Sequence, residues 1–289
     1  MRNLRRLAAA AVLLLMAVLF TAVVSADFGP KDRLDIYLTN PPADVYYLDL
    51  LYDAGGADVY GNLTEEEIAG LDADMLAMLR DNGTGWTAAM AEGTRIPLFG
   101  RLTGTAEGDT VRHTFSYYGL PETYRIIIVT ECGQTHISDP FTRRAMQSSI
   151  TYDYAAGTGE IPPLSHQYLW QFACTCLATL LIEGILLLLF RFSLRENLLP
   201  FLLVNVTTQI FLTAVVGTAL IFHGTVTAYL HYAGAEIVIL LAETVAFVFF
   251  LKGKSRARRI GYAITANAVS CTLGFFGMEL LYEMITHLA

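Results

Sequence analysis

The sequence predicts a membrane bundle of four α-helices that follows a small α+β, mainly antiparallel β domain on the extracytoplasmic side. Three features predict this fold class: a basic and then apolar N-terminus, an acidic middle region, and four long apolar runs near the C-terminus. Residues 27–166 hold 21 Asp and Glu against 9 Lys and Arg, whereas residues 167–289 hold 6 acids and 7 bases. The acidic region should face water, and its charge excludes nucleic acid as a partner.

Residues 1–26 have the pattern of a secretory signal peptide. Three arginines precede an apolar run over residues 7–24, in which Thr21 is the single polar residue, and the small residues Ser25 and Ala26 form a cleavage site. The apolar run is long for a signal peptide, so an uncleaved anchor helix is the alternative. Both interpretations place residue 27 on the outer side of the membrane.

Residues 27–160 are predicted to form the extracytoplasmic domain, and residues 161–167 a linker. The segments HTFSYYG, TYRIIIVTE, QTHISDP and SSITYDYAA indicate strands, and YRIIIVT is apolar on both faces, as in a central strand. A capping box at Thr64 and one apolar face indicate a helix over residues 65–82. We therefore expect a small antiparallel sheet with one helix. Cys132 is the single cysteine of this region, so an internal disulfide is excluded.

Catalytic motifs are missing from the sequence. It contains no HExxH, CxxC, GxSxG or P-loop motif, so we assign no catalytic residue, cofactor or metal ion. His113 and His136 lie on separate predicted strands and could approach each other, although surface histidines are the more common case.

Four membrane spans are predicted within residues 168–289, at 168–190, 198–222, 228–251 and 260–285. All seven Lys and Arg of this region fall in the first and third connecting loops, which lie on the same side of the membrane. The positive-inside rule makes that side cytoplasmic. The signal peptide and the charge bias thus both predict that residues 27–160 lie outside the cell. The helices that follow are predicted to lie in the plasma membrane.

Each predicted span carries one polar residue at nearly the same depth. These residues are Glu183, Asn205, Glu243 and Asn267. Glu236 and Glu279 lie closer to the outer side and could extend this polar layer as a column of carboxylates. A polar group facing lipid is costly, so the layer should face the bundle interior. Three interpretations remain open: hydrogen bonding between helices, proton or cation handling, and binding of a ligand or lipid head group.

Five segments, YYLDLL, LPETYRIIIVTECG, SSITYDYA, LLIEGILLLLFRF and LLVNVTTQIFL, carry a family resemblance. The chain resembles uncharacterised bacterial multi-pass membrane proteins of Gram-positive type with an exported N-terminal domain, over residues 34–280. The resemblance implies a plasma-membrane location. It implies no site residue, because that family has no assigned activity.

We expect a non-enzymatic plasma-membrane protein that binds or senses something at the cell surface, or an accessory membrane protein. Its expected partners are the lipid bilayer and either another membrane protein or a second copy of the chain. The alternative is a proton- or cation-coupled transporter or channel subunit that uses the polar layer. Four helices are few for a transporter, so this alternative requires oligomerisation. An intramembrane enzyme ranks third, because no nucleophile–base pair or metal triad is present.

Overall fold

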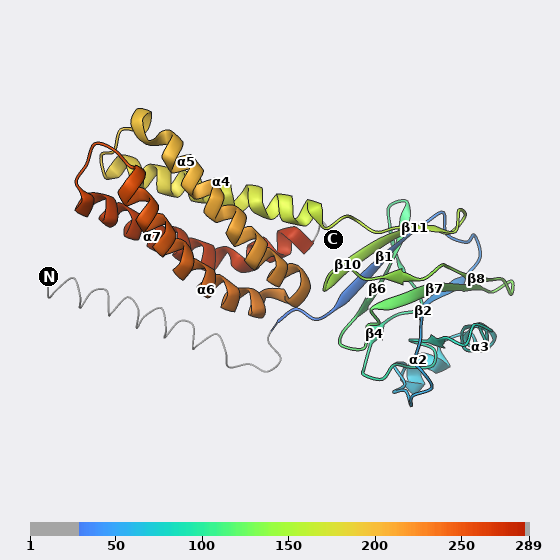
Figure 1. The fold of residues 1–289 in the computed structure, drawn as a ribbon. Coiled ribbons are helices and arrows are strands. Elements are labelled where there is room, and N and C mark those ends of the chain that lie inside the picture. The colour runs from blue at the N-terminus through green and yellow to red at the C-terminus, as the bar shows by residue number, and fades with distance from the viewer. Residues whose placement is uncertain (1–28, 287–289) are drawn as a thin grey trace. The chain divides into compact units, whose positions relative to one another are not determined.

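The computed structural model describes residues 29–286, which form an N-terminal β-sheet domain followed by long helices (Figure 1). The predicted signal peptide, residues 1–26, lies outside the described residues. We call residues 33–160 the β domain.

The first sheet of the β domain has the strand order β11-β10-β1-β6-β4, and β5 pairs with β6. Its strands are β1 (Arg33–Thr39), β4 (Phe99–Gly100), β5 (Thr105–Glu107), β6 (Thr110–Ser116), β10 (Gln147–Asp153) and β11 (Thr158–Glu160). β1 and β10 run parallel, with Arg33 opposite Gln147, whereas β1 and β6 are antiparallel. The parallel pair joins the two ends of the domain, which a purely antiparallel expectation did not include.

The second sheet has the order β3-β2-β7-β8, and β9 pairs with β7. Its strands are β2 (Tyr46–Tyr52), β3 (Thr87–Ala88), β7 (Thr123–Thr130), β8 (Thr135–Ile137) and β9 (Phe141–Thr142). All pairings in this sheet are antiparallel. β7 is a central strand, as its sequence YRIIIVT predicts, because it lies between β2 and β8.

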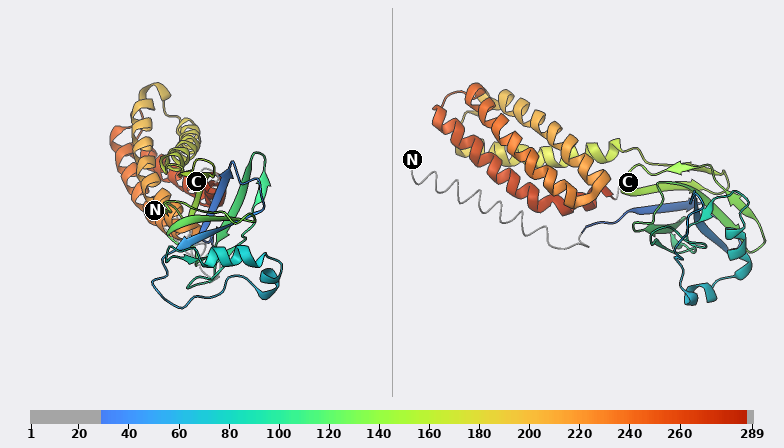
Figure 2. Two further views of the ribbon diagram at one scale, coloured as in Figure 1. Left: turned by 90° about the vertical axis from the view of Figure 1, so that its right-hand side faces the viewer. Right: turned by 60° about the horizontal axis from the view of Figure 1, so that its bottom comes forward.

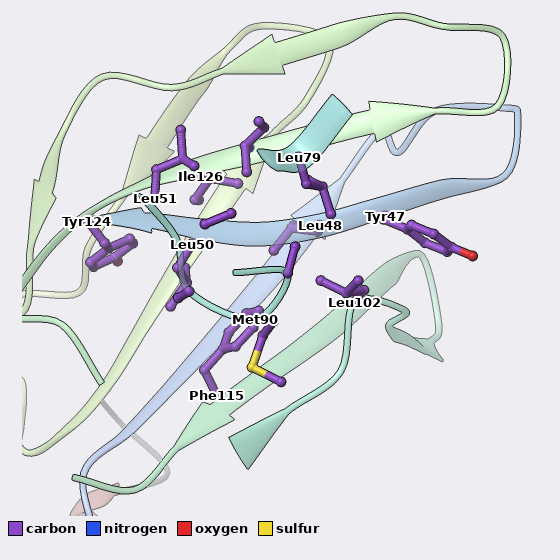
Figure 3. Close-up of a cluster of buried hydrophobic side chains, with 14 of the residues drawn as sticks. Tyr47, Leu48, Leu50, Leu51, Leu79, Met90, Leu102, Phe115, Tyr124 and Ile126 are labelled. Carbon is purple, nitrogen blue, oxygen red and sulfur yellow. The ribbon is translucent and has the colours of Figure 1, made fainter. Parts of the chain in front are cut away.

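One hydrophobic core contains buried side chains of both sheets, so the domain has two sheets where the sequence predicted one. Leu34, Ile36 and Leu38 alternate along β1 and are fully buried, as are Leu48 and Leu50 of β2. Figure 3 shows side chains of β2, β6, β7 and the helix α3 in this cluster. Apolar residues on both faces of β2 and β7 follow from this arrangement, because each strand is covered on two sides.

Two short helices, α2 (Glu65–Ala69) and α3 (Ala73–Arg80), replace the single helix predicted over residues 65–82. The predicted capping box is present: Thr64 Oγ1 accepts from the Glu67 backbone N–H, and the Glu67 carboxylate accepts from the Thr64 N–H. Gly70 then ends α2, and the Asp72 side chain caps α3 by accepting from the Met75 N–H. Glycine and aspartate favour helix ends over helix interiors, which explains the break. α3 packs against β7 and β3.

Three helices are long and apolar enough to cross a membrane: Ser165–Leu189, Leu194–Phe250 and Arg256–Thr286. The first is α4 and the third is α7. The second comprises α5 (Leu194–Leu212), a π-helical turn η1 (Thr213–Gly217) and α6 (Thr218–Phe250). The sequence predicted two spans here, separated by a loop at residues 223–227. The structure instead keeps this stretch helical apart from a break at Gly224.

The helical run Leu194–Phe250 doubles back on itself at Gly224, whose φ of 75° and ψ of −174° are not helical. Thr208 donates a hydrogen bond to Glu243 (2.6 Å), and the Asn197 side chain accepts from the Lys252 N–H (2.7 Å). Both pairs lie nearly symmetrically about Gly224. In a straight helix, Thr208 and Glu243 would be about 50 Å apart at 1.5 Å per residue.

The helices α4, α5, α6 and α7, which we call the four arms, form a closed ring. This follows because α4 and α6 each pack against both α5 and α7. The arms lie alongside one another in Figure 2. Side chains that point to the centre of this ring are therefore shared between all four arms.

Candidate functional site

The four polar residues that the sequence placed at one depth are all buried in the ring of helices. They come from α4 (Glu183), α5 (Asn205), α6 (Glu243) and α7 (Asn267), and none is more than 3% exposed. Each of the four arms thus contributes one side chain to this polar layer.

Both carboxylate oxygens of Glu243 accept hydrogen bonds. Asn267 Nδ2 donates to Oε2 at 2.8 Å, and Thr208 Oγ1 donates to Oε1 at 2.6 Å. Asn267 is held in turn, because its Nδ2 also donates to the Ala263 carbonyl at 3.0 Å. These bonds link α6 to α5 on one side and to α7 on the other, so Glu243 has the contacts of an interhelical anchor.

Only one of the two carboxylate oxygens of Glu183 accepts a hydrogen bond. Ser270 Oγ donates to its Oε1 at 3.0 Å, whereas the buried Oε2 has no hydrogen-bond partner within residues 29–286. Ser270 follows Asn267 by three residues on α7, so the two donors that hold the two glutamates lie on one face of that helix. A free, buried carboxylate oxygen is costly unless a proton, a water or a cation meets it.

Two side-chain amides on α5 also have unpartnered oxygens. Asn205 Nδ2 donates to the Phe201 carbonyl (3.0 Å), and Gln209 Nε2 donates to Thr179 Oγ1 (3.0 Å). Their buried Oδ1 and Oε1 atoms have no partner among the described residues. Because their nitrogen ends are engaged, the free ends of these side chains are acceptors.

A cavity of about 200 Å³ lies between the four arms. Its polar lining includes Gln171, Thr175, Thr179, Glu183, Gln209, Tyr232, Glu236, Glu243, Asn267 and Ser270. Along α4 it extends over about 18 Å, from Gln171 to Glu183, at 1.5 Å per residue. Of residues 29–286, no Lys, Arg or His lines it, so its three carboxylates face no basic side chain.

The column of carboxylates that the sequence suggested is only partly gathered in this cavity. Glu236 lines it two helical turns from Glu243, whereas Glu279 is exposed on the surface of α7 and does not line it. Sequence reasoning did not find Gln171, whose unpartnered Oε1 lies against Gly217 in the π-helical turn. A Cβ at position 217 would collide with that oxygen, so the glycine makes room for the amide.

A cluster of aromatic rings closes the bundle beyond the polar layer. The ring of Tyr262 has centroid distances of 5.9 Å to Phe190, 5.7 Å to Phe192 and 5.3 Å to Phe247. Its hydroxyl donates to the Glu183 backbone carbonyl at 3.3 Å. None of these four residues lines the cavity. We call this cluster the aromatic plug; it lies at the end of the bundle that carries the α4–α5 and α6–α7 loops.

The histidines of the β domain do not form a catalytic pair. His113 Nε2 contacts the Tyr46 hydroxyl (3.2 Å), and His136 Nε2 contacts the Tyr152 hydroxyl (2.7 Å). In each case the tyrosine belongs to the other sheet, so the two contacts connect the sheets. Burial lowers the pKa of His113 to about 4, which keeps it neutral near pH 7.

Asp49 is a buried carboxylate that the sequence pattern did not reveal. It accepts hydrogen bonds from the backbone N–H groups of Leu50, Met90 and Ala91, at 2.7 to 3.1 Å. Burial raises its pKa to about 7, against the opposing effect of these bonds. Its contacts hold the turn after β3 against β2, which is a structural role.

No protein-family model, no curated protein and no solved structure matches this chain. The family resemblance stays a prediction on which these comparisons do not bear. The candidate site therefore rests on its own geometry: a cavity with three carboxylates, facing amide oxygens, and no basic side chain among the described residues that line it.

Proposed function

We propose that this chain is a four-pass plasma-membrane protein whose helical bundle takes up a proton or a small cation, as a transporter or channel subunit. The observation that carries this proposal is the cavity lined by Glu183, Glu236 and Glu243 without a basic partner. A carboxylate in a low-dielectric interior requires a proton or a counter-ion. In an acidic cavity without Lys or Arg, a mobile cation or proton is the remaining source of positive charge.

The reversal at Gly224 supports four crossings. The run Leu194–Phe250 has 57 residues and would be about 85 Å long if straight, whereas the hydrocarbon core is about 30 Å thick. Folded at Gly224, each half is long enough for one crossing. The seven basic residues of the helical region then lie at one end of the bundle, in the two loops there and in the first turns of α5 and α7. By the positive-inside rule, this supports a cytoplasmic position for that end and an outer position for the β domain.

Hydrogen bonding between helices accounts for part of the polar layer. Glu243 fits this role, because both of its oxygens are bonded to neighbouring helices. It does not account for the free Oε2 of Glu183, nor for the cavity beside it. Most buried acceptors in proteins are hydrogen-bonded, so an unbonded carboxylate oxygen beside a cavity favours a bound proton or cation.

The test is flux through the full chain in proteoliposomes. We expect that an imposed proton or cation gradient drives movement reported by enclosed pH- and cation-sensitive dyes, and that Glu183→Gln abolishes it. Glu279→Gln is the matched control, because it removes a carboxylate from the exposed surface of the same bundle. Wild-type vesicles that match empty ones for protons, alkali cations and divalent cations would refute the proposal.

A surface-binding role for the β domain is the second candidate. Phe99 and Tyr118 are both more than half exposed, and the Tyr117 ring contacts both, with centroid distances of 4.7 and 4.8 Å. Tyr117 has a φ of 95°, a conformation that L-residues rarely adopt and that often marks functional surfaces. Phe99→Ala and Tyr118→Ala should then abolish recovery of a cross-linked partner from intact cells, without unfolding the domain.

A further inference from the structure

We infer that Glu183 and Gln209 form a binding site for one partly hydrated monovalent alkali cation, with Glu183 Oε2 as the charged ligand and Gln209 Oε1 as the neutral ligand. This inference rests on the proposed function and specifies which ion the cavity takes. It goes further in assigning different roles to the two buried glutamates, because Glu243 then positions the helices and Glu183 binds the ion.

The two ligand atoms are identified by their missing partners. Glu183 and Gln209 are 1% and 5% exposed, and both line the cavity. Glu183 Oε2 and Gln209 Oε1 have no hydrogen-bond partner within residues 29–286. Buried polar atoms are nearly always satisfied, so two such acceptors in one cavity indicate a bound species that donates positive charge or protons.

The two side chains are held at neighbouring levels of the α4–α5 interface. Gln209 Nε2 donates to Thr179 Oγ1 (3.0 Å), and Thr179 precedes Glu183 by about one turn on α4. Ser270 fixes the other oxygen of Glu183. Both side chains are thus anchored at the α4–α5 interface, at levels about one helical turn apart, and the remaining cavity volume can hold waters that complete the coordination.

The charge of the site selects a monovalent ion. Alkali cations are hard and prefer oxygen ligands, as Mg²⁺ and Ca²⁺ do, but Ca²⁺ usually takes several carboxylates and Mg²⁺ requires a strict octahedral shell of one or two carboxylates and several waters. Both oxygens of Glu243 are already occupied by donors, and Glu236 lies two helical turns, about 10 Å, from Glu243 along α6. Within residues 29–286, no group of three His, Cys, Asp or Glu side chains is arranged to hold a metal ion. One free carboxylate with one amide oxygen balances a single positive charge.

The cavity also defines the side from which the ion arrives. It extends from Glu183 to Gln171, where another unpartnered amide oxygen is buried. On the other side of the polar layer, the aromatic plug around Tyr262 blocks the bundle. The ion therefore reaches Glu183 past Gln209, from the end of the bundle at which α4 begins.

The experiment measures thermal unfolding of the purified full chain in detergent, titrated with NaCl, KCl or LiCl against choline chloride at equal ionic strength. We expect at least one alkali cation to raise Tm in a saturable way, because a ligand that binds only the folded state stabilises it. Glu183→Gln should lose this shift and Gln209→Leu should weaken it at least tenfold in half-saturating concentration. Glu279→Gln should respond as the wild type does. Binding of radioactive Na⁺ to the same samples checks each variant independently of its stability.

The outcomes separate this inference from the proposed function. If alkali cations have no effect but infrared spectra show a carboxyl group that titrates and is lost in Glu183→Gln, the inference is wrong and proton uptake stands. If CaCl₂ at matched ionic strength stabilises the wild type and alkali cations do not, the ion class is wrong. If neither protons nor any cation bind and no flux is seen, both proposals fail.

Discussion

Asn267 on α7 donates a hydrogen bond from Nδ2 to Oε2 of Glu243 on α6, at 2.8 Å. One turn further along α7, Ser270 donates to Glu183 on α4 at 3.0 Å. α4 and α6 are not neighbours in the ring, so α7 connects the two glutamates through a single helix face. Because the donors are three residues apart, a small rotation of α7 would affect both glutamates together.

The orientation of the β domain can be tested with a native cysteine. Cys132 is exposed at the turn between β7 and β8. If the domain lies outside the cell, a membrane-impermeant maleimide should label the wild type in intact cells, and Cys132→Ser should remove the label. In that background, His223→Cys should react from outside and Ser255→Cys only after permeabilisation, because both positions are exposed at opposite ends of α6. Labelling of position 255 in intact cells would contradict the proposed topology.

Gly224 should be the most sensitive glycine of the helical run. Its φ of 75° with ψ of −174° is a conformation that is almost exclusive to glycine. We expect Gly224→Ala to lower the free energy of unfolding by about 1–3 kcal/mol. Gly234→Ala is the matched control, because a Cβ there meets nothing within 4 Å, and helix propensity should favour it. Thermal unfolding in detergent compares the two; equal stability would mean that residue 224 is not the point of reversal.

The sequence predicted the elements of the fold better than their arrangement. The lengths of the apolar runs identified the long helices, although two predicted spans form one helical run, and the capping box at Thr64 identified the start of α2. The parallel pairing of β1 with β10 joins residues over 100 positions apart, and no local pattern encodes it. The missing loop at residues 223–227 has a similar cause: one glycine in an unusual conformation reverses the chain without the Pro, Asn, Asp or Ser residues that normally mark a turn.

For the candidate site, the sequence indicated the depth of the polar residues in the membrane but not their hydrogen-bond partners. One polar residue per apolar run was enough to propose a layer of Glu183, Asn205, Glu243 and Asn267. It could not distinguish Glu243, with both oxygens bonded, from Glu183, with one free. Gln171 lies near the start of α4, where a polar residue is expected at a membrane interface, so its burial in the cavity had no sequence signal.

The β domain should fold without the helices. Its core is one continuous cluster of buried residues from both sheets and from α3. We expect residues 27–160, expressed alone, to form a soluble monomer without disulfides, with a cooperative unfolding transition. Circular dichroism and analytical ultracentrifugation provide the measurements. A chain that stays unfolded or aggregates would mean that the helices complete the core.

Asp49 and His113 should have opposite effects on how the stability of the β domain depends on pH. The pKa of Asp49 is raised to about 7 in the folded state, so its stabilising contribution is full below about pH 4 and is lost as pH rises to 7. The pKa of His113 is lowered to about 4, so its contribution is present above about pH 6.5 and is lost as pH falls to 4.

These two slopes oppose each other between about pH 4 and 6.5. In Asp49→Asn, the remaining effect of His113 should make the free energy of unfolding rise with pH across this window, by about 3 kcal/mol. In His113→Gln, the remaining effect of Asp49 should make it fall by a similar amount. Urea denaturation at several pH values measures both slopes, and slopes of the same sign would show that one pKa is shifted in the other direction.

The hydrogen bond between Asn267 and Glu243 leads to a last prediction. It separates the contribution of the shape of the Glu243 side chain to stability from that of its charge. In Glu243→Gln, the new Oε1 can still accept from Asn267 Nδ2. The new Nε2 can donate to Thr208 Oγ1, because that hydroxyl can turn its proton to the Asn205 carbonyl, 3.0 Å away. All partners then stay satisfied, and we expect a free energy of unfolding within about 0.5 kcal/mol of the wild type.

Glu243→Leu removes both acceptors and leaves Asn267 Nδ2 with only the Ala263 carbonyl. We expect it to cost about 1–2 kcal/mol, the range found for hydrogen bonds between helices in membranes. Asn267→Leu should cost a similar amount, and the double variant should cost less than the sum, because the two single changes remove the same bond. If the costs add, the contact at 2.8 Å contributes nothing to stability. If Glu243→Gln alone is as damaging as Glu243→Leu, the negative charge of Glu243 is required, and its role as a purely hydrogen-bonded anchor is wrong.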